Sequence, residues 1–373
     1  MIFEPVYEGL RDACRAFDMR RERIAKSAIE RWLEPQVGPA LSSDKLISHI
    51  IADAMLRRMD RRLVEAKNIY LESFDISQIE LFYAMTKGYP QVPKAHDIAN
   101  QYLSHELRSH TSATFVEIGI GRGVQVKGVV DRLAADPGKL RELTVLAIDP
   151  DPENLRASRA LLEGTKGALP FSLTVLEKEG FLERFTPATF EDLARTAGPN
   201  VVMNSAYTIH HTAHPVGNSD VRTRLFRALR EAFAPKLFTL VEPNANHDTE
   251  QLGPRLAACF EHFGTVFDLI DRSQLPDVEK FVIKEKFFGR EIRDIFGTSD
   301  AFRCERHETL ESWLLRLTKA GWEPYEALGT IDVTLPTYCS AALDDGMVRL
   351  GYRGLPLLSV FAYRSGNTPS RHS

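Results

Sequence analysis

The sequence predicts an α/β fold: a doubly wound, mostly parallel sheet with a helical cap before it and a helical insert within it. Three observations lead to this fold class. Residues 1–110 carry apolar side chains at helical spacing, and residues 113–241 alternate short β-branched runs with helical stretches. Residues 249–305 return to helical, aromatic-rich sequence. Alternation of strands and helices is typical of a parallel sheet covered on both faces.

The composition limits the class of protein. Of 373 residues, 43% are hydrophobic and 26% charged, as in globular proteins, and the formal net charge of −4 gives no general attraction to nucleic acid. The four cysteines form no C-x-x-C pair, so neither a disulfide framework nor a cysteine zinc site is predicted. The chain has no signal-peptide pattern and no apolar run of the roughly 18 residues that a membrane helix needs. We therefore expect a cytoplasmic protein without nucleic-acid or membrane partners.

The first 110 residues are predicted to form the helical cap. Apolar side chains from Leu46 to Met55 recur at helical spacing, and four arginines follow between residues 57 and 62. Acidic residues flank these arginines, so we interpret them as a solvated helix face rather than a binding surface. Residues 75–108 continue the helical pattern.

Five strands and the helices between them are predicted next. The strands are Thr114–Ile118, Leu143–Ile148, Phe171–Leu176, Asn200–Asn204 and Leu237–Val241. The helices are 124–135, 153–163, 187–197 and 219–233. After the insert, a helix at 308–320 and strands at Trp322–Leu328 and Leu355–Tyr363 complete a domain of residues 111–364, and a tail of residues 365–373 follows. In open sheets of this kind, ligands bind beyond the carboxyl ends of the strands.

A glycine-rich turn follows the first predicted strand. Gly119, Gly121 and Gly123 alternate there, and glycine permits both positive φ and the close approach of a ligand. A dinucleotide-binding G-x-G-x-x-G would require glycine where the chain has Val124, which disfavours an NAD-dependent enzyme. The pattern Glu117-x-Gly-x-Gly-x-Gly instead resembles the first motif of class I S-adenosylmethionine (SAM) methyltransferases. The alternative is a turn that is glycine-rich only for tight packing.

The next two strand ends supply further candidates for binding SAM. An acidic residue at the end of the second strand, here Asp149, is placed to accept the ribose hydroxyls, while Asp151 suits the cap of the following helix. Beyond the third strand, Glu179 is a candidate acceptor for the adenine amino group, and Phe181 is a candidate to pack on the ring. A plain solvated loop is the alternative for this segment. Together with Glu117 and the three glycines, Asp149, Glu179 and Phe181 are the predicted SAM-binding residues.

Polar clusters follow the fourth and fifth strands, and their convergence predicts a small-molecule pocket. Histidine is the side chain best suited to remove a proton near neutral pH. The predicted catalytic residues are His210, Glu242 and His247. The predicted contacts to the acceptor substrate are Asn204, Tyr207, His211 and Asn246.

A metal site is the alternative reading of one histidine pair. His210 and His214 lie four residues apart, as in zinc-binding helices. Pro215 and the absence of a fixed third ligand argue against this reading, so no metal is predicted.

Five segments share motifs with one protein family: Val202–His210, Phe238–His247, Phe288–Ile292, Arg306–Glu308 and Leu358–Arg364. They resemble the GRAS family, which is known for plant transcriptional regulators with bacterial relatives. The resemblance implies a Rossmann-type methyltransferase fold with a helical cap. Plant members carry a Val-His-Ile-Ile-Asp type motif where this chain keeps its glycine turn. The resemblance therefore implies a bacterial-type member with an intact SAM site.

The hypothesis from the sequence is a SAM-dependent methyltransferase that acts on an oxygen or nitrogen of a small molecule. The sequence specifies neither the acceptor nor the oligomeric state. The alternative is a non-catalytic regulatory module, in which the same pocket senses SAM or a small hormone-like acid.

Overall fold

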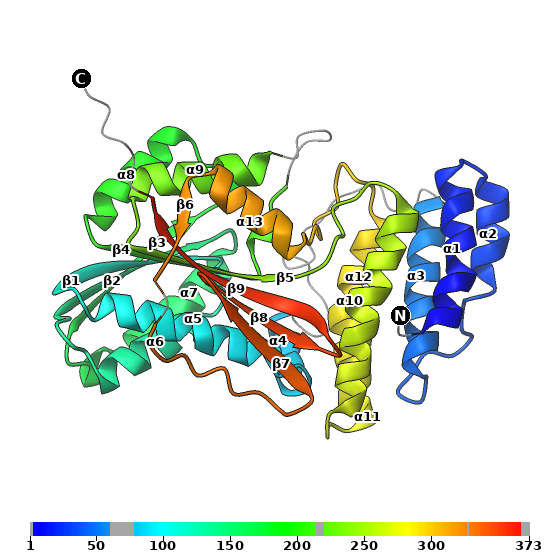
Figure 1. Cartoon of the computed structure of the whole chain (residues 1–373), viewed down its shortest axis with the longest axis horizontal. Helices are drawn as coiled ribbons and strands as arrows, with labels where there is room; N and C mark the ends of the chain where they lie inside the picture. Colours follow the sequence, from blue (N-terminus) through cyan, green and yellow to red (C-terminus); the bar gives the residue numbers. More distant parts are fainter. Residues whose placement is uncertain (1–2, 60–77, 214–219, 327, 367–373) are drawn as a thin grey trace.

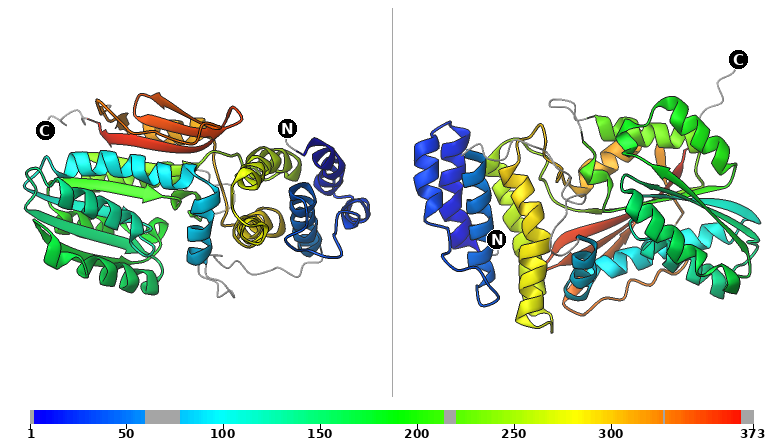
Figure 2. Two further views of the ribbon diagram at one scale, coloured as in Figure 1. Left: turned by 90° about the horizontal axis from the view of Figure 1, so that it is seen from below. Right: turned by 180° about the vertical axis from the view of Figure 1, so that it is seen from behind.

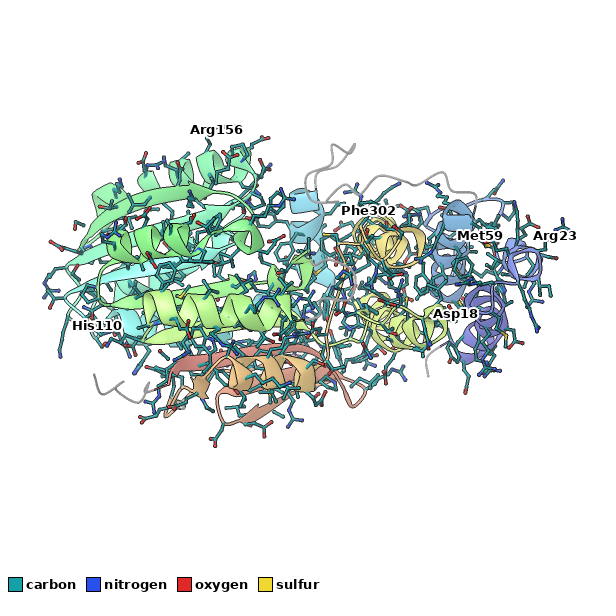
Figure 3. All side chains as sticks on the ribbon, turned by 90° about the horizontal axis from the view of Figure 1, so that it is seen from above. Asp18, Arg23, Met59, His110, Arg156 and Phe302 are labelled. Atoms are coloured by element: carbon teal, nitrogen blue, oxygen red, sulfur yellow. The ribbon has the colours of Figure 1, made fainter. Side chains whose placement is uncertain are left out.

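A helical bundle and a mixed sheet lie at opposite ends of the molecule (Figure 1). The computed structural model describes residues 3–59, 78–213, 220–326 and 328–366. In Figure 3, Arg23 marks the helical end, and His110 and Arg156 mark the sheet end. The first described residues belong to the helices, and the last described residues belong to the sheet (Figure 2).

The bundle combines the start of the chain with the predicted insert. Helices α1 (Glu4–Asp18) and α3 (Ser43–Met59) pack against α10 (Leu252–Arg272) and α12 (Gly289–Gly297). Helix α2 (Glu22–Glu30) lies outside them and packs on α1 and α3. Between α10 and α12 lie α11 (Asp277–Val282) and a π-helical turn, η4 (Ile283–Phe288). Buried side chains of α10, among them Phe260, Phe263 and Phe267, belong to the apolar core of the molecule.

The two described arginines at the end of α3 have different surroundings. Arg57 donates to Asp53 at 3.0 Å, and half of its side chain is exposed, as predicted for a solvated face. Arg58 instead donates to Asp300 at 3.2 Å and is mostly buried. Arg61 and Arg62 lie outside the described residues.

The sheet is mixed and mostly parallel, which confirms the predicted α/β fold. Its strands occur in the order β3-β2-β1-β4-β5-β9-β8-β7, and β6 pairs with β9. The parallel strands are β1 (Ser112–Ile118), β2 (Glu142–Asp149), β3 (Ser172–Glu179), β4 (Val201–Ala206) and β5 (Leu237–Pro243). The antiparallel strands are β6 (Trp322–Pro324), β7 (Cys339–Asp344), β8 (Met347–Tyr352) and β9 (Leu355–Ser365).

Helices cover both faces of the sheet because successive strand side chains point to opposite sides (Figure 2). On β1, Phe115 joins the core beneath α5 (Gln91–Leu107), α6 (Val124–Ala135) and α7 (Pro152–Glu163). Its neighbour Val116 joins the second core, beneath α8 (Pro187–Ala197), α9 (Val221–Phe233) and α13 (Leu310–Lys319).

Side-chain caps explain where several helices begin. Asp151, Thr186 and Thr309 each accept a hydrogen bond from a backbone N–H in the first turn of α7, α8 and α13. The predicted helix bounds in this part of the chain differ from the observed ones by no more than a few residues.

The last strands were predicted less well. The predicted strand Trp322–Leu328 pairs regularly only as far as Pro324, and β7 and β8 were not predicted. Asp345 and Gly346 connect β7 to β8 in a two-residue hairpin turn, and an Asp-Gly pair is a strong hairpin signal.

Candidate functional site

A cavity of about 660 Å³ opens beyond the carboxyl ends of β1, β2 and β4. The sheet supplies one side of it, and α4 (Gln78–Gly88), α5, η4 and α12 supply the other. Its volume lies within the range of sites for small organic ligands. The predicted site residues that line it are Glu117, Gly119, Gly121, Asp149, Phe181, Tyr207, His210 and His211.

The three glycines of the turn have positive φ but different surroundings. Their φ angles are 76°, 52° and 79° at Gly119, Gly121 and Gly123. A Cβ at Gly119 would lie 2.1 Å from Oγ1 of Thr208, and a Cβ at Gly123 would lie 2.9 Å from the Cβ of Ser158. A Cβ at Gly121 would meet nothing within 4 Å. Two glycines therefore serve close packing, whereas Gly121 leaves open space beside the cavity.

Glu117 is a buried carboxyl group at the end of β1. Its Oε1 accepts a hydrogen bond of 2.7 Å from Nδ2 of Asn204, and its Oε2 has no hydrogen-bond partner within the described part of the chain. Burial raises the pKa of Glu117 to about 8, although the bond from Asn204 lowers it. Asn204, predicted to contact the substrate, lies behind Glu117 and accepts from the Thr239 hydroxyl at 2.6 Å.

Asp149 lines the cavity and also fixes the glycine turn. Its Oδ2 accepts from the Gly121 N–H at 2.9 Å, and its Oδ1 accepts from the Asp151 N–H and from Asn154 Nδ2 at 2.9 and 3.2 Å. Burial raises the pKa of Asp149 against the effect of these bonds. A carboxylate offers about four acceptor positions, so one remains for a ligand hydroxyl. Asp151 caps α7, as predicted.

Of the two residues predicted to bind adenine, only Phe181 lines the cavity. Phe181 lines the cavity, and the Arg184 guanidinium lies 4.4 Å from its ring centroid. Glu179, at the end of β3, is exposed and does not line the cavity. The solvated-loop interpretation therefore fits Glu179 better than a contact to adenine.

His210 lies between two buried carboxylates. It belongs to a short 3₁₀ helix, η3 (Ile209–His211), and its Nδ1 is 2.5 Å from Oε2 of Glu242. Its Nε2 is 3.5 Å from Oε2 of Glu305. Burial lowers the pKa of His210, but the two carboxylates raise it to about 9. An imidazolium has no lone pair with which to accept a proton, so His210 does not fit the role of a base at neutral pH.

The remaining predicted residues do not line the cavity. Glu242 accepts from the Ile209 N–H at 2.8 Å and so holds η3 in place. Asn246 is exposed. His247 is buried, and burial holds its pKa well below the usual range. Its Nδ1 is 2.9 Å from Nδ1 of His307.

Several cavity residues were not identified from the sequence. They come from helices of the cap and insert and from the segment before α13. Glu305, just behind the wall, and His307 belong to a segment in which the sequence resemblance had included only Arg306–Glu308. The unpredicted lining residues include Phe82, His96, Glu291 and His307.

Two overlapping groups in the described residues have ligand atoms close enough to hold one metal ion. The first is His210, His211 and Glu305, and the second is Glu291, Glu305 and His307. His214, of the predicted histidine pair, lies outside the described residues.

Among the described helices, none is long and apolar enough to cross a membrane.

The chain is similar to plant proteins along most of its length. It is 24% identical over 339 residues to the DELLA protein GAIP of Cucurbita maxima, and this alignment covers 87% of this chain and 56% of that protein. It is 26% identical over 305 residues to Scarecrow-like protein 21 of Arabidopsis thaliana, and this alignment covers 79% of this chain and 71% of that protein. The alignments span about half to three fifths of the length of DELLA protein GAIP, DELLA protein RGL3 and Scarecrow-like protein 5.

A solved plant structure has the same fold. The crystal structure of SCL7 from Oryza sativa matches 96% of this chain and 99% of its own chain, with a TM-score of 0.73 and 19% identity. A SAM-dependent methyltransferase from Methanosarcina mazei aligns with a TM-score of only 0.37, which supports no inference about activity.

The prediction that this chain is an enzyme is wrong. The relatives that it matches over most of its length bear the names of DELLA and Scarecrow-like proteins, which are not names of enzymes.

The family relationship covers most of the chain. The profile of the GRAS domain family matches residues 8–347, which is more than half of the sequence. The resemblance inferred from five short segments is thereby confirmed, and the chain belongs to the GRAS domain family.

Proposed function

We propose that this chain is a non-catalytic, ligand-binding GRAS module whose cavity takes an adenosyl compound, with SAM as the ligand that its residues fit best. The observation that carries the proposal is the open space at Gly121 beside the cavity. A turn that is bare toward a cavity allows a ligand to approach backbone atoms that a side chain would cover.

The order of the parallel strands supports this assignment. In β3-β2-β1-β4-β5, the winding reverses between β1 and β4, and doubly wound sheets bind ligands at such a reversal. The cavity opens at the ends of these two strands. We infer the Rossmann-like arrangement of class I methyltransferases, used here for binding without catalysis.

Three side chains fit different parts of SAM. Oε2 of Glu117, which has no partner in the described residues, suits the ammonium group of the methionine portion, whose charge would favour the ionised carboxylate. The remaining acceptor position of Asp149 suits a ribose hydroxyl, and the ring of Phe181 offers an apolar face to adenine. Tyr207 and Phe82, with ring centroids 6.0 Å apart, form part of the aromatic lining across the cavity.

Calorimetric titration of the full chain with SAM tests the proposal. We expect binding to the wild-type chain and none to a Gly121→Val variant, because the valine side chain would fill the open space. Gly354→Val is the matched control: its φ is +80°, a Cβ there also meets nothing within 4 Å, and it lies outside the cavity. SAM binding should persist in this control.

Three results would contradict the proposal. They are no heat of binding to the wild-type chain, an affinity unchanged by Gly121→Val, or preferential binding of NAD. A turnover assay tests the claim that the chain does not catalyse methyl transfer. Incubation of the SAM-bound chain with carboxylic acids and phenols should release no S-adenosylhomocysteine, and turnover with any of them would show that the chain is catalytic.

A further inference from the structure

Glu305 is a fully buried carboxylate without a hydrogen bond to either oxygen. Its side chain has no exposed surface, and neither Oε1 nor Oε2 has a hydrogen-bond partner in the described residues. Burial of an ionised carboxylate costs several kcal/mol unless paired or coordinated charge compensates it. The charge of Glu305 is therefore compensated by a neighbouring cation, which can be the His210 imidazolium or a metal ion that takes the place of its Nε2 proton.

Three imidazole nitrogens surround this carboxylate at 3.3–3.5 Å, farther than in charge-assisted hydrogen bonds. His210 Nε2 and His307 Nε2 lie 3.5 and 3.3 Å from Oε2, and His211 Nδ1 lies 3.4 Å from Oε1. Charge-assisted N–H···O bonds measure about 2.7–2.9 Å. The nearby bond between His210 and Glu242, at 2.5 Å, shows that close pairs do form in this segment.

The separations of His210 and His211 from the carboxylate of Glu305, 3.5 and 3.4 Å, are compatible with atoms that share a metal ion. Ligands about 2.0–2.2 Å from a tetrahedral Zn²⁺ lie about 3.3–3.6 Å from one another. The ligand atoms of His210, His211 and Glu305 all lie within 4.8 Å of one another. Two imidazoles and one carboxylate are also a known ligand set of zinc sites that keep one position open.

The surroundings of these side chains orient them as metal ligands are usually oriented. Glu242 accepts from Nδ1 of His210, which turns Nε2 toward Glu305. The backbone N–H of Glu305 donates to Oδ2 of Asp294 at 2.6 Å, and its carbonyl accepts from Arg303 at 2.6 Å. Hydrogen bonds therefore fix both the His210 ring and the backbone of Glu305.

We propose that His210, His211 and Glu305 bind one divalent transition-metal ion, represented experimentally by Zn²⁺. His210 and His211 line the cavity, so the fourth position of the ion faces the space where a ligand binds. This inference does not depend on SAM being the ligand. The nitrogen-rich ligand set selects Zn²⁺ over Mg²⁺, which prefers six oxygen ligands.

Metal analysis of the untagged, full-length chain tests this site. The chain is treated with a chelator, loaded with Zn²⁺, separated from free metal and analysed for zinc by mass spectrometry. We expect one ion per wild-type chain and loss of the ion in Glu305→Gln and His211→Gln. Glu242→Gln should weaken zinc affinity about 10–100-fold, because it removes the group that orients His210.

Two variants serve as controls for the ligand assignment. His262→Gln changes another buried histidine of the same cavity that belongs to neither ligand group, and it should retain the ion. Glu291→Gln should also retain it. Loss of zinc in Glu291→Gln but not in His211→Gln would overturn the assignment in favour of the second group.

Measurements on the wild-type chain keep the test valid where a variant fails to fold. Zn²⁺ should raise the melting temperature and Mg²⁺ should not, and Co²⁺ should give the visible absorption of a tetrahedral site. A wild-type chain that retains no zinc and shows neither effect would refute the site. Full retention of zinc in both Glu305→Gln and His211→Gln would refute it as well.

Discussion

Glu117 links the stability of the protein to pH. Burial raises its pKa from an ordinary value near 4.5 to about 8, so the folded chain holds a proton that the unfolded chain releases between these values. The contribution of Glu117 to the free energy of unfolding therefore falls as pH rises from about 4.5, and it levels off above about 8. The slope reaches about 1.4 kcal/mol per pH unit.

A Glu117→Gln variant should lack this contribution. We expect its free energy of unfolding in urea to decline less than that of the wild type between pH 5 and pH 8. Glutamine keeps the shape of the side chain and its acceptor for Asn204 Nδ2. The exposed Glu142→Gln serves as control and should leave the wild-type slope unchanged. Parallel curves for the wild type and Glu117→Gln would show that Glu117 is ionised in the folded chain.

Site residues that belong to one local pattern could be predicted from the sequence, whereas those brought together from distant segments could not. Glu117 and Asp149 could be predicted because each ends a strand within a regular strand–turn–helix pattern. Glu305 could not, because it approaches His210 only through the folding of a segment that is almost a hundred residues away. No spacing rule connects two such residues in one sequence.

Helix α10 receives its N-terminal cap from another helix. The side chain of Gln251, at the cap position, makes no capping bond. Asp18, at the end of α1, accepts from the Leu252 and Gly253 N–H groups at 3.0 Å each (Figure 3). A carboxylate at this position also interacts favourably with the helix dipole. Asp18 thus joins the start of the chain to the inserted helices.

Removal of this cap should destabilise the chain measurably. We expect Asp18→Ala to lower the free energy of unfolding by about 0.5–1 kcal/mol, the lower part of the range for cap removal, because Asp18 is exposed. Urea unfolding followed by circular dichroism measures the change. Asp12→Ala, on the exposed face of α1, should change stability by less than about 0.5 kcal/mol. Equal effects of both substitutions would rule out a specific capping role.

Helices and strands with a clear hydrophobic pattern were predicted, whereas strands that are defined only by their pairing with neighbouring strands were not. Strands β1 to β5 are short apolar runs between helices, so their bounds followed from the sequence. Strand β7 is largely exposed and has no apolar run, and only the Asp345-Gly346 turn marks the hairpin that it forms with β8. The pairing of β8 with β9 then stabilises this hairpin, and a linear sequence does not display that contact.

The two ends of the molecule meet around the cavity. The insert is rich in phenylalanine, and such side chains can cover a ligand or form the core of the insert itself. The structure shows both: Phe287 and Phe288 line the cavity, whereas Phe260 and Phe263 are buried within the bundle. Helices α4 and α5 complete the wall (Figure 1). A ligand in the cavity would therefore contact both the sheet and the helices, which is the arrangement that a sensing module needs.

The most direct test is a crystal structure of the full chain grown with SAM. We expect density for the ligand in the cavity, with the ligand against Gly121, its ammonium group at Glu117 and a ribose hydroxyl at Asp149. A cavity that stays free of SAM at saturating concentration, or SAM bound elsewhere on the molecule, would contradict it.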